Sequence, residues 1–436
     1  MAFPKALPQK PVNFAREIID HMKLPDVSTF DAAHRPIAFV STMEGAPWGG
    51  SEELWSRVAV RLKATGRRVV ANIVHWPQEA PAISAMRTHG VDVSTRPRLD
   101  SLRNRVLKRL RGEFARGWLS RVRPRLLIIS QGGNLDGLVW MEHAAQMQIP
   151  FVTIAQMAND SYWPPADLGD RAAAVYPLAE QCFFVSKGNR DLTEMQIACR
   201  LPRSSVVRNP VNISSNLSLP LPWPSHEDGI FRLAVVGRLA PCAKGQDIIL
   251  QVLATAKWRN RPVHVSLFGD GFFRKSMERL VKMMNLEMVH FAGHVTQIDQ
   301  VWSTHHALLM ASRYEGLPLA LVEAMLCGRV PIVTDVAGNA EMVTDDVTGF
   351  VAEAPKPACL NEAMERAWNA RNRWREMGLA AAAKVRQLLP EDPIADFIQR
   401  LPLPFGSPMV VDPSPGIASV TAARCIESLP PSLNRI

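Results

Sequence analysis

Apolar residues in this chain gather in short continuous runs rather than alternating with polar ones. Such runs are typical of strands covered on both faces, as in a parallel sheet. We predict strands at 36–42, 68–75, 126–131, 150–156 and 181–186 in the first half, and at 232–237, 263–268, 306–311 and 330–334 in the second. Helical patterns lie between the runs, so the expected fold class is α/β, with right-handed crossovers and parallel sheets.

The segment NPVNISSNLSLPLPWPSHEDG, residues 209–229, separates the two sets of strands and is rich in Pro and Ser. It lacks periodicity, which indicates an interdomain linker. We therefore predict Rossmann-like domains over 1–208 and 230–400, joined by this linker. The Pro-rich tail at 401–436 is expected to be irregular, and packing back on the first domain is left open. Two such sheets should face a central cleft, with ligands at the carboxyl ends of the strands.

Composition narrows the class of protein. The chain has 436 residues, and 47% of them are hydrophobic, which suits two domain cores. The sequence shows no apolar run of membrane-spanning length and no secretory signal near its start. The six cysteines form no CxxC pair, so reduced thiols are expected rather than disulfides or a zinc site. These features predict a cytoplasmic protein.

The basic residues are concentrated in one segment. Residues 96–125 hold eleven Arg or Lys and two acids, so the net charge of +9 is local. Apolar residues recur there at four-residue spacing, which predicts a cationic helix with a narrow apolar stripe: Leu102, Val106, Leu110, Phe114 and Trp118. Such a helix either lies on an anionic membrane, making the protein peripheral on its inner face, or packs on the first sheet. No aromatic platform or known motif supports nucleic-acid binding.

The stretch EGLPLALVEAM, residues 315–325, has the form of a strand-end loop followed by a helix. Glu315 lies on the loop, Pro318 suits the first helical position, and Glu323 lies inside the helix. Free N–H groups at a helix start favour an anion, and carboxylates accept hydrogen bonds from sugar hydroxyls. The pattern predicts a site for an anionic, hydroxylated ligand. A solvated pair of surface glutamates is the alternative.

Further polar motifs follow the neighbouring strands. VVGRLAPCAKGQD places Arg238 and Lys244 just after a strand, where they can clamp a diphosphate or, alternatively, form surface ion pairs. FGDG brings Asp270 and two glycines to the next strand end. AGHV (292–295) and AGNAEMV (337–343) follow later strands.

In this order, GRL…KGQD, LFGDG, FAGHV, SRYEGLPLALVEAM and VPIVTDVAGNAEMVTDDVTGFV resemble the C-terminal half of retaining glycosyltransferases of family four. The resemblance is dense over residues 231–352. It implies the GT-B fold of two Rossmann-like domains. It also implies transfer of a sugar from a nucleotide-sugar donor to a glycan or lipid-linked acceptor. A front-side mechanism without metal or other cofactor is expected, and no DxD motif follows a strand.

The resemblance also implies roles for individual residues. Arg238 and Lys244 would hold the donor diphosphate, and Glu315, a catalytic candidate, would contact hydroxyls of the transferred sugar. The remaining implied donor contacts are the backbone of Gly316 and Leu317, Glu323 at the ribose, the backbone from Gly293 to Val295 at the base, and Asp270 near the nucleotide.

In the first half, the loop after the first strand looks like the family's glycine loop beside the donor diphosphate. Gly49 and Gly50 are therefore placed at the donor, with Ser51 as the predicted N-cap of a helix from Glu52. Glu52 and Glu53 would repel a phosphate, so they are left out of the site. A plain capped helix start is the alternative.

Gln156 stands where family members often carry a histidine close to the reacting sugar. Glutamine cannot act as a base, but it can orient a hydroxyl or the leaving group, and we keep it as a catalytic candidate. A front-side mechanism needs no protein nucleophile, because the leaving phosphate can take the acceptor proton. Asn159 and Asp160 are candidate acceptor contacts or loop caps, and Asn209 is expected to be structural.

Other functions are compatible with the two-domain fold. A nucleotide-sugar epimerase would need further carboxylate and histidine acid–base groups, and a phosphorylase would need a lysine for pyridoxal phosphate. The sequence offers neither pattern. A non-catalytic nucleotide-sugar-binding protein is the third option, and it would bind the nucleotide without turning it over.

Overall fold

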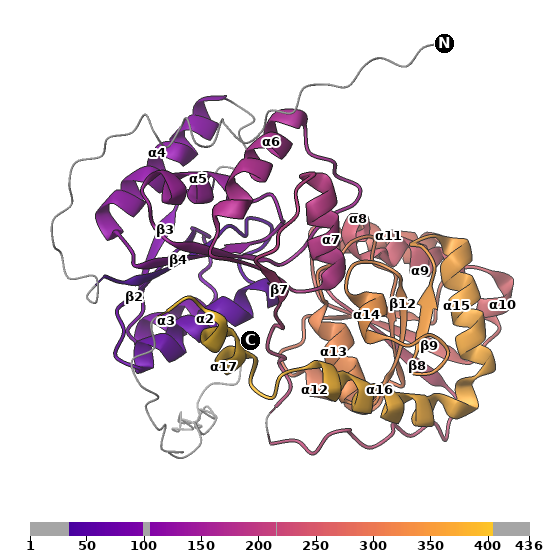
Figure 1. Cartoon of the computed structure of the whole chain (residues 1–436). Helices are drawn as coiled ribbons and strands as arrows, with labels where there is room; N and C mark the ends of the chain where they lie inside the picture. Colours follow the sequence, from indigo (N-terminus) through magenta and orange to yellow (C-terminus); the bar gives the residue numbers. More distant parts are fainter. Residues whose placement is uncertain (1–34, 99–104, 215, 404–436) are drawn as a thin grey trace, which may run out of the picture. The chain divides into compact units, whose positions relative to one another are not determined.

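The computed structural model describes residues 35–98, 105–214 and 216–403, and leaves the side chains of 105–111 undescribed. Two sheets carry the fold (Figure 1). The first has seven parallel strands in the order β3-β2-β1-β4-β5-β6-β7. Their bounds are β1 Ile37–Ser41, β2 Val69–Val74, β3 Asp92–Arg96, β4 Leu126–Gln131, β5 Phe151–Ala155, β6 Gln181–Phe184 and β7 Ser204–Val206.

The second sheet has six parallel strands in the order β10-β9-β8-β11-β12-β13. Their bounds are β8 Phe231–Val236, β9 Val263–Phe268, β10 Val289–Gly293, β11 Ala307–Met310, β12 Val330–Thr334 and β13 Phe350–Ala352. Both sheets lie within one compact unit of the chain, whose last residue is Pro402. The predicted α/β fold class, with two Rossmann-like parallel sheets, is confirmed. The predicted domain boundaries stay a prediction.

Helices connect the strands of each sheet. Figure 1 shows α2 and α3 on one side of the first sheet and α4, α5 and α6 on the other. In the first half the helices are α2 Gly50–Ala64, α3 Pro81–Thr88, α4 Arg105–Val122, α5 Leu138–Gln146, α6 Ala166–Val175, η2 Tyr176–Leu178 and α7 Lys187–Gln196. In the second half they are α8 Pro241–Lys244, α9 Gln246–Leu253, α10 Ala256–Arg259, α11 Arg274–Met283, α12 Ile298–Thr304, α13 Leu319–Leu326, α14 Asn339–Met342, α15 Pro357–Asn369, η3 Arg371–Arg373, α16 Trp374–Leu388 and α17 Pro393–Arg400.

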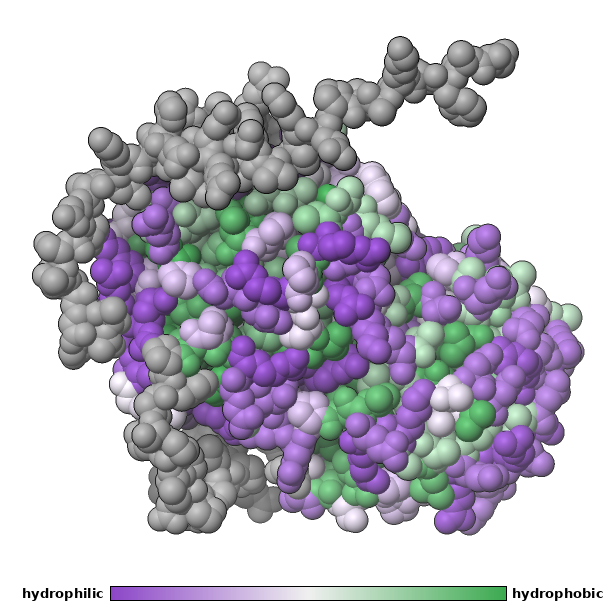
Figure 2. All heavy atoms as spheres, viewed as in Figure 1, coloured by the Kyte–Doolittle hydropathy of each residue, from purple (hydrophilic) through white to green (hydrophobic). Residues whose placement is uncertain are grey.

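The interior strands are buried on both faces. Every residue of β1, β2, β4 and β12 is buried, so each run of Val, Ile, Leu and Phe contributes to packing above and below its sheet. Burying one such side chain contributes about 1.5–3 kcal/mol. The outer surface seen in Figure 2 mixes polar with apolar residues, as is usual for globular proteins.

The predicted linker is tied along the second sheet. Arg329 is fully buried, and it donates to the backbone oxygens of Trp302 and Pro222. The backbone N–H of Asn212, near the start of the segment, donates to a side chain of α13. Asn212 and Pro222 of this segment are therefore held by specific contacts with the second half of the chain.

The last described helix, α17, contacts the first sheet and its helix α2. The ring of Phe397 packs edge-on against Phe183 with centroids 4.9 Å apart, and Asp392 pairs with Arg61. Residues of α17, which precede the tail predicted at 401–436, therefore make the contact with the first half of the chain. Residues 404–436 of that tail lie outside the described part of the chain.

The cationic helix predicted around residues 96–125 is α4. Trp118 is buried and packs edge-on against Trp140 of α5 with centroids 5.7 Å apart, while Phe114 approaches the same ring at 6.4 Å. In the C-terminal half of α4, the structure therefore favours packing of the apolar stripe against the first domain over contact with a membrane. Leu102 and the side chains of Val106 and Leu110 lie outside the description. Within the described residues, every helix is too short or too polar to cross a membrane.

We expect Trp118→Ala to lower the free energy of unfolding by about 3–5 kcal/mol, because it opens a cavity against Trp140. The exposed Arg116 on the same helix provides the control, since Arg116→Ala should change stability by less than about 0.5 kcal/mol. Urea unfolding followed by tryptophan fluorescence measures both. Equal stability of the two variants would contradict the packing of α4 on α5.

Candidate functional site

The loop between β11 and α13 is pressed against the end of β5. A β-carbon on Gly316 would lie 1.9 Å from the backbone oxygen of Gln156 and 2.7 Å from Val185 Cγ2. The backbone oxygen of Gly316 also accepts a hydrogen bond from the N–H of Gly338, at 3.0 Å. Any larger residue at 316 would force these segments apart. The structure thus brings the predicted residues Glu315 and Gly316 next to the end of β5.

Glu315 is a buried carboxylate with a cationic partner. Its Oε1 accepts a hydrogen bond from Ser312 Oγ at 2.7 Å and forms an ion pair with Lys244 Nζ. Lys244 ends the short helix α8, and Gly245 follows it with a φ of 63°. A β-carbon on Gly245 would lie 1.8 Å from the backbone oxygen of Ala311, so glycine allows α8 to touch the end of β11. A buried carboxylate needs such partners, because its unpaired charge would be costly.

Arg238 reaches from the end of β8 to the loop after β1. Its side chain is exposed, and Nη1 donates to the backbone oxygen of Gly45 at 2.9 Å. Burial raises the pKa of Tyr314, and both Arg238 and Glu315 act electrostatically on the same phenol. The predicted cations and Glu315 therefore share one neighbourhood, and Leu317, buried on the same loop, lies beside it.

Two helix starts meet at this place. A β-carbon on Gly50, the first residue of α2, would lie 2.8 Å from Leu319 Cδ1, and Leu319 is the first residue of α13. The N-cap of α2 is Gly49 in an extended conformation. The prediction of Ser51 as N-cap is therefore wrong, because the helix begins before that residue. Converging helix N-termini present free N–H groups, which suit an anion.

The two acids at the start of α2 are engaged elsewhere. Glu52 is buried and accepts a hydrogen bond from Trp55 Nε1 at 2.9 Å, and burial raises its pKa. Glu53 accepts from Trp48 Nε1 at 2.9 Å and pairs with Arg57 at 2.7 Å. Their side-chain bonds hold these carboxylates within the first half of the chain.

Gln156 contacts the site through its backbone oxygen, which lies against Gly316. Its side chain is buried and exchanges two hydrogen bonds with the amide of Asn209, at 2.8 and 3.4 Å. Asn209 thus has a structural contact of the kind expected for it. The amide of Gln156 is held toward Asn209, and its predicted catalytic role stays a prediction.

Glu323 is buried on α13 and faces the segment after β7. Its Oε1 accepts a hydrogen bond from the backbone N–H of Asn212 at 3.0 Å. Burial, together with the nearby charge of Glu53, raises the pKa of Glu323 to about 7, although the hydrogen bond from Asn212 lowers it.

The residues predicted near the nucleotide base lie on the ends of β9 and β10. The N–H of Gly269 donates to the backbone oxygen of Gly293 at 2.7 Å, which joins the two strand ends. Asp270 is exposed and accepts a hydrogen bond from the N–H of Gly271 at 2.7 Å, so it stabilises its own turn. Val295 is half-buried against the core of the second sheet.

The loop after β5 displays two aromatic rings that the sequence analysis overlooked. Tyr162 and Trp163 are 47% and 60% exposed. Gln196 Nε2 donates to the backbone oxygens of Asn159 and Tyr162, each at 2.8 Å, and fixes the loop. Asn159 Oδ1 accepts a hydrogen bond from the N–H of Ser161 at 2.9 Å. Of the two roles expected for Asn159, acceptor contact and loop cap, this bond is the loop cap. The sequence signal that could have identified these rings is the pair of aromatic residues directly before Pro-Pro in SYWPP.

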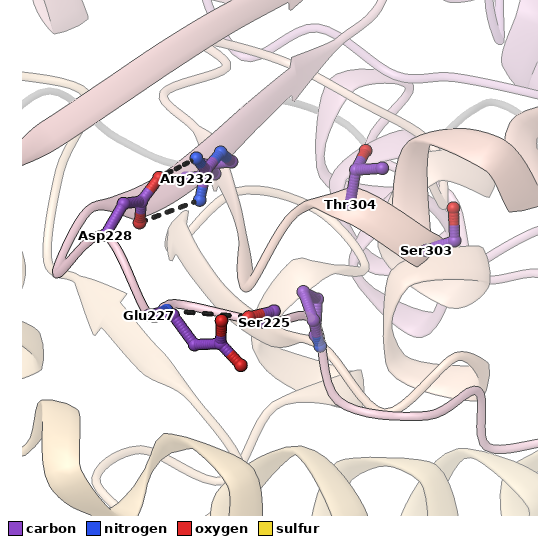
Figure 3. Close-up of a pocket in the computed structure, with 7 residues that line it drawn as sticks. Ser225, Glu227, Asp228, Arg232, Ser303 and Thr304 are labelled. Atoms are coloured by element: carbon purple, nitrogen blue, oxygen red, sulfur yellow. Dashed lines mark hydrogen bonds and ion pairs between the residues drawn. The ribbon is translucent and has the colours of Figure 1, made fainter.

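A separate cavity of about 390 Å³ opens beside the start of β8 (Figure 3). Asp228 and Arg232 form an ion pair there, and Ser303 and Thr304 lie on the nearby end of α12. Arg238 follows β8 at its opposite end, so this cavity is not the predicted site. Among the described residues, no three His, Cys, Asp or Glu side chains are grouped so that they could hold a metal ion.

A segment in the second half of the chain is similar to known proteins. Residues 225–384 match the family model described as glycosyl transferases group 1. Over 110 residues the chain is 31% identical to the Vi polysaccharide biosynthesis protein VipC/TviE of Salmonella typhi, covering 25% of this chain and 19% of that protein. Over 130 residues it is 32% identical to an uncharacterized glycosyltransferase of Methanocaldococcus jannaschii, covering 29% and 35%. These matches span about a fifth to a third of the relatives' lengths.

Solved structures extend the likeness of the fold over most of the chain. Anabaena HepE in complex with UDP superposes with a TM-score of 0.64 at 18% identity, covering 84% of this chain and 98% of that one. The lipopolysaccharide outer core galactosyltransferase WaaB in its apo form gives 0.61 at 17% identity, with the same coverage. At such identities the likeness establishes the fold alone.

We expect Gly316→Ala to lower the free energy of unfolding by about 1–3 kcal/mol or more, because the added carbon overlaps the Gln156 carbonyl. Gly117 is the matched control, since it is exposed on α4 and a β-carbon added there would have no neighbour within 4 Å. Gly117→Ala should raise stability by up to about 1 kcal/mol, since alanine favours a helix. Chemical denaturation distinguishes the two, and a neutral Gly316→Ala would contradict the close contact.

Proposed function

We propose that the whole chain is a retaining glycosyltransferase that uses a nucleotide-sugar donor, since residues 225–384 match the family model of the group 1 glycosyl transferases. One observation carries this proposal: Lys244, Glu315 and the starts of α2 and α13 converge on one place. Cations and helix N-termini suit a diphosphate, and a carboxylate suits sugar hydroxyls.

The ion pair between Lys244 and Glu315 suggests how the donor is accepted. Without the donor, the half-buried Lys244 neutralises the buried Glu315. A diphosphate offers Lys244 a second anionic partner, and we infer that Arg238 joins it, because Arg238 and Glu315 both act on the phenol of Tyr314. The carboxylate of Glu315 then becomes available to a hydroxyl of the transferred sugar. Charge-assisted hydrogen bonds of this type are short and strong, so they orient the sugar.

The proposed reaction needs no protein nucleophile. The bond between the sugar's anomeric carbon and the phosphate oxygen breaks while the acceptor oxygen bonds to the same face of that carbon. The acceptor proton passes to the leaving phosphate oxygen. Glu315 positions the sugar, and the end of β5 at Gln156, which touches Gly316, forms the wall beside it.

For the acceptor, glycans and lipid-linked sugars are both proposed. The exposed rings of Tyr162 and Trp163 lie on a fixed loop that begins at the Gln156–Gly316 contact. Aromatic rings pack well against the C–H face of a pyranose, and polar groups of the same turn can meet its hydroxyls. These rings are the acceptor contacts that we favour over Asp160.

For the donor, the first candidates come from structural neighbours. HepE of Anabaena has been solved with UDP, with UDP and glucose, and with UDP-glucose. A thermal-shift screen of the purified chain against UDP-, GDP- and ADP-sugars would identify the donor class. Binding without turnover in every case would favour the non-catalytic alternative. Interconversion of free nucleotide sugars would favour an epimerase.

We expect Glu315→Gln to slow hydrolysis of the best donor by about 10- to 100-fold, because a charge-assisted hydrogen bond to the sugar is lost. Glu227→Gln in the separate cavity is the control and should leave the rate unchanged. Released nucleotide, measured by a coupled assay, gives both rates. Unaltered hydrolysis in Glu315→Gln would refute the assignment of Glu315.

We expect Trp163→Ala to reduce transfer to a glycan acceptor by about tenfold, because a stacking surface worth about 1 kcal/mol or more is removed. Donor hydrolysis by water should persist, since Trp163 lies outside the donor contacts. Met283→Ala, another exposed apolar residue, is the control. Loss of hydrolysis along with transfer would argue against an acceptor role for the ring.

A further inference from the structure

A chain of side-chain contacts leads from α2 to the segment after β7. Glu53 accepts hydrogen bonds from Trp48 Nε1 at 2.9 Å and from Arg57 Nε and Nη2 at 3.0 and 2.7 Å. Arg57 Nη2 also donates to Asn212 Oδ1 at 2.9 Å. One guanidinium therefore holds both a carboxylate on its own helix and a side chain 155 residues further along the chain.

The chain of contacts continues to Glu323. The backbone N–H of Asn212 donates to Glu323 Oε1 at 3.0 Å, and the Glu323 side chain is buried on α13. Arg57 fixes Asn212 by its side chain, and Asn212 in turn fixes Glu323 by its backbone. Breaking this hydrogen bond would leave a buried carboxylate oxygen without that partner, which is costly, so the bond favours the observed orientation of Glu323.

The surroundings of Glu323 make this arrangement sensitive to charge. Glu53 on α2 is the titratable group that acts on Glu323, and its charge opposes the ionisation of Glu323. Arg57 neutralises Glu53 and so permits two carboxylates to lie near each other. Burial raises the pKa of Glu323 to about 7, so we expect its charge to depend on pH near neutrality.

We propose that Arg57 and Asn212 are positioning residues for the donor, because they hold Glu323 ready to accept hydrogen bonds from the ribose hydroxyls. This inference rests on the proposed function, since the ribose contact belongs to it. Arg57 lies on a helix of the first half of the chain, so the donor's ribose contact depends on both halves.

The proposal fixes a pH dependence. Ribose hydroxyls donate to an ionised carboxylate, whereas a protonated carboxyl offers a weaker acceptor. With a pKa of about 7 for Glu323, donor affinity should rise about tenfold between pH 6 and pH 8. Without Arg57, the uncompensated Glu53 should move the midpoint of this rise to higher pH.

Isothermal titration calorimetry on the full chain, with UDP-glucose and GDP-mannose as probes, tests this at pH 6, 7 and 8. Both probes are diphosphate diesters, which do not titrate in this range. We expect Arg57→Ala to weaken binding of the active probe about fivefold at pH 7 and to shift the midpoint upward. Arg57→Lys should restore part of the affinity, because it keeps the charge opposite Glu53.

Matched variants separate positioning from general damage. Arg61 lies one turn further along α2 and forms an exposed ion pair with Asp392. The variant Arg61→Ala loses only this pair and should bind the probe with wild-type affinity. Asn212→Ala keeps the N–H to Glu323 and loses only the Arg57 contact, so a smaller weakening is expected. Glu323→Gln should bind weakly with no pH dependence.

Two results would overturn the inference in different ways. Wild-type affinity and midpoint in Arg57→Ala would refute the positioning role and leave the proposed function intact. A wild type that binds neither probe, nor any sugar nucleotide in the thermal-shift screen, would refute the proposed function and this inference with it.

Discussion

The ion pair between the buried Glu315 and the half-buried Lys244 is the interaction on which the candidate site depends. A buried carboxylate is tolerated only with partners, and here they are one cation and the hydroxyl of Ser312. The pair also dictates backbone geometry. Lys244 can reach Glu315 because Gly245 lets α8 touch β11, and Glu315 sits beside β5 because Gly316 has no side chain. The charge requirement and the two glycines therefore specify one arrangement together.

The sequence predicted the interior of both sheets and missed their edges. Each predicted strand overlaps an observed one, while β3, β7, β10 and β13 went unrecognised, and these four are the outer strands of the two sheets. An edge strand is covered less completely, so it needs no continuous apolar run. The sequence of β3, DVSTR, has one buried residue in five, and its polar positions resemble a loop. Hydrophobic runs report burial on two faces, which edge strands lack.

Sequence patterns predicted which motifs of the candidate site would meet, but not which side chains would pair. Parallel strands end on one edge of a sheet, so motifs following strands were expected to meet, and Lys244 and Glu315 do. The partners that bind individual side chains could not be foreseen. Gln156 is held by Asn209, 53 residues away, and Glu323 by Asn212, 111 residues away. No local pattern encodes such pairings, because they arise only when distant segments pack.

Those two pairings give the segment after β7 a different meaning from the one its composition suggests. Pro and Ser enrichment predicted a passive linker, yet Asn209 and Asn212 stand three positions apart and hold Gln156 and Glu323. Gln156 lies at the end of β5, and Glu323 lies on α13. A shift of this short segment by about one ångström would disturb both at once, since neither hydrogen bond can stretch far without breaking. The connection between the two halves is therefore part of the candidate site.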